Sequence, residues 1–243
     1  MLNKYFSSFV LILMLSVIPP AHAQISPESA SSAEPGMEDL YQLVKNFKES
    51  YDKIDDYSAN LHKEELSENG KWTKEVLDFR FKKPFAIKIK WIAGPKKGRK
   101  AVFVEGKNNN KIQIYLGGLI SIILPKVDLD PNSDLAKDDS GHTIREAGLG
   151  YMMEEMTKIT IGAYDKGELA LKVIDKKGDI LRVQRDLPSG KGYASEKLII
   201  YINQDLGIPI GVERYHADGK MFGKYIYDDL KTNQGLKDSE FKL

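Results

Sequence analysis

The chain has 243 residues and a nearly neutral charge, with 36 lysines and arginines against 35 aspartates and glutamates. This balance argues against nucleic acid or an anionic membrane as the main partner. The sequence contains no cysteine, which excludes disulfide bonds, a cysteine nucleophile and a lipid anchor on cysteine. A chain of this length can form one large β domain with a sizeable hydrophobic core.

The N-terminal segment has the pattern of an export signal. Lys4 precedes an apolar run over about residues 9–18, and an Ala-His-Ala triplet follows two prolines. The run is shorter than the roughly 20 apolar residues that a membrane-spanning helix needs. We therefore predict a cleaved signal peptide over residues 1–23 and a soluble periplasmic protein that is not lipid-anchored. Residues 24–37, rich in Ser, Pro, Glu and Ala, predict a disordered leader.

A single domain over residues 38–243 is expected to follow. In residues 38–51, apolar residues recur at spacings of three and four, which is the pattern of an amphipathic helix. Short alternating segments separated by turns rich in Gly and Asn come next. They predict an antiparallel meander.

The most regular alternation lies in residues 74–91, KEVLDFRFKKPFAIKIKW. On both sides of Pro84 the period is two, which predicts a pair of half-buried strands with one apolar face and one charged face. Further strands are predicted over residues 100–105 and 112–116. We expect the apolar residues of these strands to form the wall of a ligand cavity: Leu77, Phe79, Phe81, Phe85, Ile87, Ile89, Trp91, Val102, Val104, Ile112 and Ile114.

The pattern changes after Gly117, where residues 119–124 are apolar without alternation. Such a run is compatible with a strand buried on both faces or with a flap across an apolar mouth. A second helix is predicted over residues 143–156. The helices over residues 38–51 and 143–156 are the candidate lids of the cavity, although an amphipathic helix can equally plug a core. The lid residues are Leu119, Ile122, Ile144, Met152 and Met156.

The rest of the chain predicts six more strands, over residues 159–164, 169–174, 180–185, 193–203, 208–215 and 221–230. About eleven strands with two helices predict a mainly β (α+β) fold. The expected architecture is an unclosed antiparallel β-barrel, or strongly curved sheet, with a helical lid or plug.

No spacing of residues predicts a catalytic or metal site. The histidines His62, His142 and His216 lie in separate segments, and no GxSxG motif is present. The acidic segment 128–139 imitates a calcium loop but has serine where such loops require glycine. We therefore expect no enzyme, cofactor or metal. An enzyme would need a cleft that gathers His142, Arg145 and carboxylates.

The order of these segments resembles the LolA/LolB-like lipoprotein carriers and receptors. The segments that carry the likeness are FRFKKPFAIKIKW (79–91), KAVFVEGKNNNKIQIY (100–115), HTIREAGLG (142–150) and the closing YIYDDLKTNQGLKDSEF (225–241). The likeness spans about residues 38–241 and is strongest to exported LolA-like proteins of unassigned function.

This resemblance implies an unclosed β-barrel with a helical lid, an apolar cavity for acyl chains and no enzymatic activity. In the carrier, an arginine before the proline pins the lid by hydrogen bonds. The matching residue here is Lys83, whose point charge cannot reproduce the planar fork of arginine.

Together, these features favour a periplasmic, non-catalytic carrier that shelters a lipid or the acyl chains of a lipoprotein. We expect a monomer that works between an inner-membrane donor and an outer-membrane acceptor and binds no nucleic acid. The alternative is a protein-interaction or envelope-stress sensor module whose cavity is filled by its own side chains.

Overall fold

The computed structural model describes residues 35–67, 70–138 and 141–243. The predicted signal peptide and all but the last three residues of the predicted leader lie outside the described residues. The described residues form part of one compact unit, Glu34–Leu243. None of the helices in this part of the chain is both long enough and apolar enough to cross a membrane.

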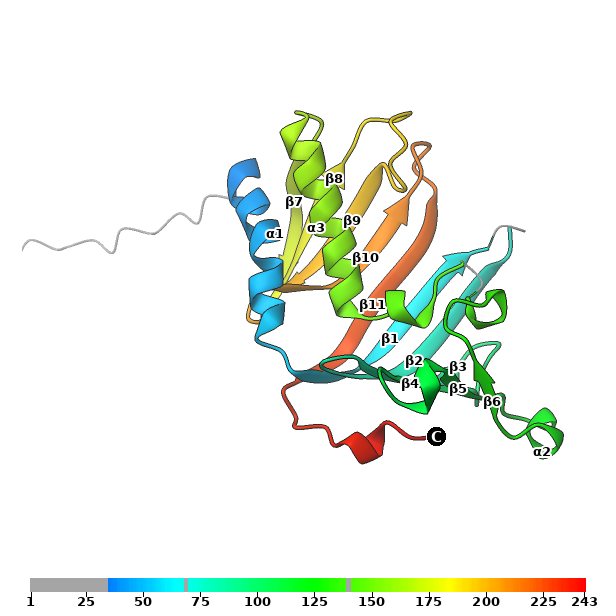
Figure 1. Ribbon diagram of the computed structural model, residues 1–243. Helices are drawn as coiled ribbons and strands as arrows, with labels where there is room; N and C mark the ends of the chain where they lie inside the picture. The colour runs from blue at the N-terminus through cyan, green and yellow to red at the C-terminus, as the bar shows by residue number, and fades with distance from the viewer. Residues whose placement is uncertain (1–34, 68–69, 139–140) are drawn as a thin grey trace, which may run out of the picture. The chain divides into compact units, whose positions relative to one another are not determined.

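The described strands form one antiparallel sheet that does not close into a barrel (Figure 1). The order across the sheet is β6-β5-β4-β3-β2-β1-β11-β10-β9-β8-β7, so two meanders meet where the first strand pairs with the last. The strands are β1 (Asp56–Leu66), β2 (Trp72–Lys82), β3 (Ala86–Ala93), β4 (Lys100–Val104), β5 (Ile112–Tyr115), β6 (Val127–Leu129), β7 (Ala170–Lys177), β8 (Ile180–Asp186), β9 (Lys197–Asn203), β10 (Ile208–Tyr215) and β11 (Met221–Thr232).

Two long helices, α1 (Met37–Asp52) and α3 (Leu149–Asp165), pack against each other and against one face of the sheet in its β7–β11 half (Figure 1). A third helix, α2 (Ile120–Ile123), is a single turn between β5 and β6. The unclosed antiparallel barrel with helices over its inner face confirms the predicted fold class.

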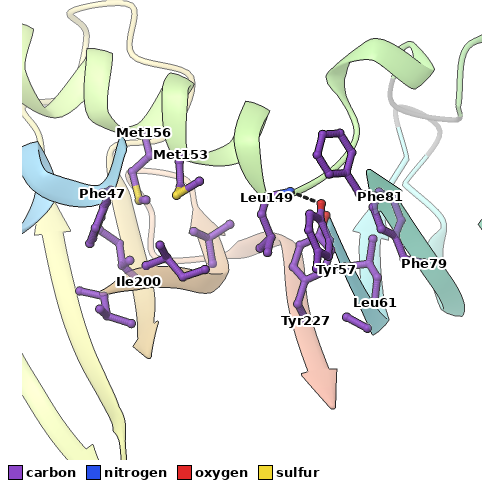
Figure 2. Packing of buried hydrophobic residues seen from close by; sticks show 14 of the residues in the cluster. Phe47, Tyr57, Leu61, Phe79, Phe81, Leu149, Met153, Met156, Ile200 and Tyr227 are labelled. Atoms are coloured by element: carbon purple, nitrogen blue, oxygen red, sulfur yellow. Dashed lines mark hydrogen bonds between the residues drawn. The ribbon is translucent and has the colours of Figure 1, made fainter. Parts of the chain in front are cut away.

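The helices are held to the sheet by apolar residues at helical spacing. On α1 the buried residues are Leu40, Tyr41, Val44 and Phe47, as the sequence pattern predicted. On α3, Met153 and Met156 extend toward the sheet, near Phe47 and Ile200 (Figure 2). These side chains belong to one continuous core, and burial of each of them contributes about 1.5–3 kcal/mol.

The second helix was predicted in the wrong place. It begins at Leu149 and ends at Asp165, so the strand predicted over residues 159–164 is wrong and those residues are helical. Their β-branched side chains favour a strand, but the helical spacing of Met156, Thr160 and Ala163 buries all three on one side. The strand missing from the predicted set is β6, which lies after the apolar run 119–124, at the start of the acidic segment that follows it.

Residues 143–148 precede the helix instead of starting it. Ile144–Glu146 form a 3-10 turn, closed where the Thr143 N–H donates to the Glu146 carboxylate over 2.7 Å. Gly148 then has φ of 100°, a conformation that side-chain-bearing residues rarely adopt. This backbone geometry delays the helix to Leu149.

The apolar run 119–124 is neither a buried strand nor a flap over a cavity. It contains the short helix α2, and three of its apolar side chains face solvent: Leu119 is 84%, Ile122 77% and Ile123 87% exposed. The lid role predicted for Leu119 and Ile122 is therefore wrong. The absence of alternation signalled an unusual segment, but it did not distinguish burial from exposure.

Tyrosine hydroxyls from the sheet and α1 bind the N-terminus of α3. The Leu149 N–H donates to the buried Tyr57 hydroxyl over 2.9 Å (Figure 2). The hydroxyls of Tyr227 and Tyr51 lie close to the backbone of Gly148 and Gly150. The first N–H groups of a helix have no partner within the helix, so the tyrosines supply acceptors that also fix where α3 begins.

The C-terminal segment after β11 crosses the outer face of the sheet. The buried Asp56 carboxylate accepts the N–H groups of Gln234 and Leu236 over 2.7 and 3.0 Å. Leu236 and Phe241 then pack on β3 and β4 in a second small apolar cluster. The closing pattern that resembled the LolA-like family thus seals the outer face of these strands.

Replacing Tyr57 with phenylalanine should keep the aromatic packing and remove the hydroxyl acceptor. We expect the free energy of unfolding to fall by about 1–3 kcal/mol, because the buried Leu149 N–H loses its partner. Urea denaturation measures the change. The control Tyr164→Phe removes a hydroxyl that binds Glu38 near solvent and should cost less than about 0.5 kcal/mol. Equal losses in the two variants would contradict the capping role.

Candidate ligand-binding cavity

A cavity of about 490 Å³ lies between the inner face of the sheet and helix α3. Its lining comes from the strands β5, β4, β3, β2, β1, β11, β10, β9 and β8, in their spatial order across the sheet. Helix α3 and the segment before that helix complete the lining. Its volume is in the range of small-molecule sites, roughly 300–1,000 Å³. The cavity is thus large enough for a ligand of small-molecule size.

Six of the predicted wall residues line this cavity: Leu77, Phe79, Ile89, Trp91, Ile112 and Ile114. Phe81 and Phe85 line a separate hollow of about 600 Å³, beside Tyr51 and the Lys83-Pro84 step. Ile87 is completely buried in the core and is part of neither lining. Period two thus placed these residues on the inner face, but it did not distinguish cavity wall from packed core.

Val102 and Val104 lie on the outer face. In the β3–β4 register, Ile89 faces Ala101 and Ile87 faces Phe103, and residues directly opposite each other in an antiparallel pair share a face. Ala101 therefore lines the cavity, whereas Val102 joins the cluster under the C-terminal segment. Every residue from 101 to 104 is apolar, so only the register decides which pair faces inward.

Three of the predicted lid residues, Ile144, Met152 and Met156, line the cavity from the helix side. Lys83, the predicted latch, contacts α1, one of the two helices predicted as lids. Its ammonium donates to the backbone carbonyl of Asp52 over 2.9 Å, at the C-terminal end of α1 where a cation is favoured.

A charged cluster occupies one side of the cavity. The Lys63 ammonium lies 2.8 Å from Glu65 and 2.6 Å from Asp138. The Tyr225 hydroxyl donates to the other oxygen of Glu65. His142 donates its backbone N–H to Asp138 over 2.9 Å, and its ring Nδ1 lies 3.7 Å from the same carboxylate. These contacts tie the segment before α3 to strand β1.

The members of the cluster shift one another's pKa values. Burial alone would raise the pKa of Asp138, but hydrogen bonds from His142 and Lys63 outweigh burial and hold that pKa well below its usual range. The hydrogen bond to Asp138 raises the pKa of His142. The pKa of Lys63 is also raised, because the charges of Asp138 and Glu65 outweigh its burial.

Glu65, Asp138 and His142 place their ligand atoms within 4.8 Å of one another, close enough to share a cation. The cation between the two carboxylates is the Lys63 ammonium. Arg145 does not join them, because it binds Glu105 over 2.9 Å and lines the other hollow. The grouping that we required of an enzyme is therefore incomplete.

Sequence reasoning did not select Lys63, Glu65 or Arg185, although all three line the cavity. The signal was present in the alternation. In β1, Leu61, Lys63 and Glu65 share one face, and in β8, Arg185 shares a face with buried Leu181 and Val183. The predicted cavity wall contains only the apolar residues of the alternating segments.

Comparisons with known proteins place the fold. The solved structure of MucB has a TM-score of 0.50 and 12% identity, with 86% of this chain and 64% of MucB covered. The Mycobacterium tuberculosis lipoprotein LppX has a TM-score of 0.47 and 12% identity, with 83% and 99% covered. A LolA superfamily protein from Nitrosomonas europaea has a TM-score of 0.37 and 10% identity, with 83% and 96% covered.

These likenesses concern the fold alone, because the sequence identities are so low. The chain spans 64% of the length of MucB. In sequence, the model of a family described as "Protein of unknown function (DUF1571)" matches residues 54–243. No curated protein matches the sequence.

Replacing His142 with glutamine should destabilise the protein in a pH-dependent way. The folded-state pKa of His142 is raised by Asp138, and the charges of Glu146 and Glu65 act in the same direction. Its contribution to stability is therefore fully present below the unfolded-state pKa of about 6.5 and is lost as the pH rises through the folded-state pKa. Melting temperatures at about pH 5.5 and about pH 9 should show the larger loss at the lower pH.

The control is His62→Gln, at an exposed position on the outer face of β1. It should change the melting temperature little at either pH. A loss for His142→Gln that is the same at both pH values would contradict an ion pair with Asp138.

Proposed function

Since the chain belongs to the DUF1571 family, whose function is unknown, we propose that it is a non-catalytic carrier for a lipid or the acyl chains of a lipoprotein. The observation that carries this proposal is the cavity of about 490 Å³ between α3 and the inner face of the sheet. The predicted signal peptide supports a periplasmic location.

Apolar burial is the force available for binding. Leu77, Phe79 and Ile89 line the sheet side of the cavity, and Met152 and Met156 line the helix side. A ligand that buries about 200 Å² of apolar surface there gains roughly 5 kcal/mol, before the cost of association. Methionine side chains adapt to the shape of their neighbours, which suits a site for acyl chains of different lengths.

The charged groups beside this wall are engaged with one another. The carboxylates of Glu65 and Asp138 share the ammonium of Lys63, and His142 is bound to Asp138. A catalytic acid or base must reach the proton that it transfers, and these groups serve the packing of the segment before α3. This supports binding as the function of the cavity.

The exposed helix α2 favours a second candidate function, an interaction module. Leu119, Ile122 and Ile123 are all more than three quarters exposed, and contiguous exposed apolar residues often mark a binding surface. This role is compatible with a carrier, which must meet a donor and an acceptor. It replaces the carrier role only if the cavity takes up no ligand.

A fluorescent acyl probe tests the carrier function. The purified protein should bind the probe, and Ile114→Trp should weaken binding at least about tenfold, because Ile114 lines the cavity and lies partly buried near the edge of the sheet. The matched control is Gln113→Trp, one residue earlier on β5 and absent from the lining. Its affinity for the probe should equal that of the unchanged protein.

Mass spectrometry of the organic extract should also find a lipid that copurifies with the protein. Absence of a lipid from the extract together with no uptake of the probe would contradict the carrier function. Probe binding that both tryptophan variants reduce equally would place the ligand outside this cavity.

A triple variant separates the two candidate functions. Changing Leu119, Ile122 and Ile123 to serine should alter the free energy of unfolding by less than about 0.5 kcal/mol, because these side chains face solvent. The variant should bind the acyl probe as the unchanged protein does. If neither protein binds the probe, the cavity is self-filled and the interaction module is the remaining candidate.

A further inference from the structure

Arg185 is a buried cation in the wall of the cavity. It lies on β8, its residue is 2% exposed, and it lines the cavity together with Leu198 of the neighbouring strand. Helix α3 covers it, with the Thr160 hydroxyl 3.3 Å from Arg185 Nη1. Arginine is rarely buried this completely unless its charge is paired.

Among the residues that the structure describes, Arg185 forms no ion pair with a carboxylate. Its guanidinium contacts the neutral hydroxyl of Thr160, and its Nε has no hydrogen-bond partner in the described part of the chain. A buried charge without a counter-ion is strongly unfavourable. Elsewhere on the same strand, Arg182 is paired with Asp175, so the chain does neutralise an arginine nearby.

The surroundings of Arg185 add positive charge. Arg214, on β10, lines the same cavity. Burial, reinforced by the charge of Arg214, lowers the pKa of Arg185 to about 10. The guanidinium is still charged at neutral pH, and the two cations together favour an anion between β8 and α3.

A second orphaned donor lines the cavity. The buried side-chain nitrogens without a partner in the described part of the chain are Arg185 Nε and Trp91 Nε1, and both residues are in the lining. Trp91 lies on β3, in the other half of the sheet from β8. A buried donor that lacks an acceptor costs about 1–3 kcal/mol, so Arg185 Nε favours a ligand that carries an oxygen acceptor on the β8 side of the cavity.

We propose that the ligand is an anionic amphiphile whose carboxylate or phosphate group binds Arg185, while its acyl chain lies along the apolar wall toward β5. This inference rests on the proposed carrier function and names the class of its ligand. An anion on a guanidinium forms charge-assisted, often bidentate hydrogen bonds. The carboxylates of Glu65 and Asp138 oppose such an anion little, because Lys63 neutralises them.

Matched ligands test the proposal. Palmitate and palmityl alcohol share one chain and differ in charge, and a lysophosphatidate with its monoacylglycerol repeats the comparison for phosphate. Each competes with the fluorescent acyl probe at about pH 7.5, where Arg185 is charged. We expect at least one anion to bind roughly tenfold or more tightly than its neutral partner. The anion with the larger preference identifies the headgroup as carboxylate or phosphate.

Variants of Arg185 test whether this residue causes the preference for anionic over neutral ligands. Arg185→Met should bind anionic and neutral ligands with equal affinity, and Arg185→Lys should keep part of the preference. The matched control Arg182→Met, on the opposite face of β8, should keep all of it. Circular dichroism and the affinity for the neutral ligand show whether each variant is folded.

The outcomes separate this inference from the carrier function. Equal binding of anionic and neutral ligands by the unchanged protein overturns the inference and leaves the carrier function in place. Binding of neither overturns the carrier function. A preference for anions that survives Arg185→Met also overturns the assignment to Arg185. If Arg185→Met does not fold, Arg185→Lys provides the test. Its preference for anionic over neutral ligands must then be smaller than that of the unchanged protein, and an equal preference overturns the assignment.

Discussion

The position of helix α3 depends on hydrogen bonds between its first backbone N–H groups and tyrosine hydroxyls. Tyr57 on β1 accepts from Leu149, and the hydroxyls of Tyr227 on β11 and Tyr51 on α1 lie close to the backbone of the adjoining glycines. A Cβ atom on Gly148 would lie 2.7 Å from the Tyr57 hydroxyl. The glycines therefore permit the approach, and the tyrosines determine where the helix begins.

The cavity follows from this anchoring. From its fixed N-terminus α3 passes over β10, and it packs tightly where Leu149, Met153 and Met156 meet the core. Beside that contact the sheet continues through β1 to β5 without a long helix over it (Figure 1). Aromatic residues fill part of this half: the Tyr57 ring lies 5.9 Å from Phe79 and 5.3 Å from Phe81. The lined cavity is the space that these side chains leave.

Much of the fold could be predicted from the sequence because period two is a local property. It identified β1 to β5 and β7 to β11, and three-and-four spacing identified α1. It failed at residues 159–164, where β-branched side chains favour a strand but packing requires a helix. The pattern also failed at α2, because the apolar character of residues 119–124 does not show whether another part of the fold covers them. In both segments, contacts with the rest of the fold decide the structure, and these contacts are not visible in the local sequence pattern.

The cavity was less predictable than the fold. Which of Val102 and Phe103 faces inward depends on the β3–β4 register, and registers are fixed by turns that the sequence specifies weakly. The charged lining was visible as Lys63, Glu65 and Arg185 at inner positions. We did not select these residues, because a search for an apolar wall passes over charges. A polar residue at an inward position is itself a candidate site residue, because burying it is costly unless it has a partner.

The pairing of β1 with β11 contributes to the curvature of the sheet. Among the described strands, the two meanders join only along this pair. Both pairings of β11 contain a break in register, with one extra residue of β11 opposite Ser58–Asn60 of β1 and one opposite Arg214–Tyr215 of β10. The β2–β3, β7–β8 and β9–β10 pairs contain further breaks. Such bulges bend a strand and increase its local twist. The separation of β5 from β8, the far walls of the cavity, therefore depends on the curvature of the whole sheet, to which the bulges in β11 contribute. A change of twist in β11 would change the width of the cavity.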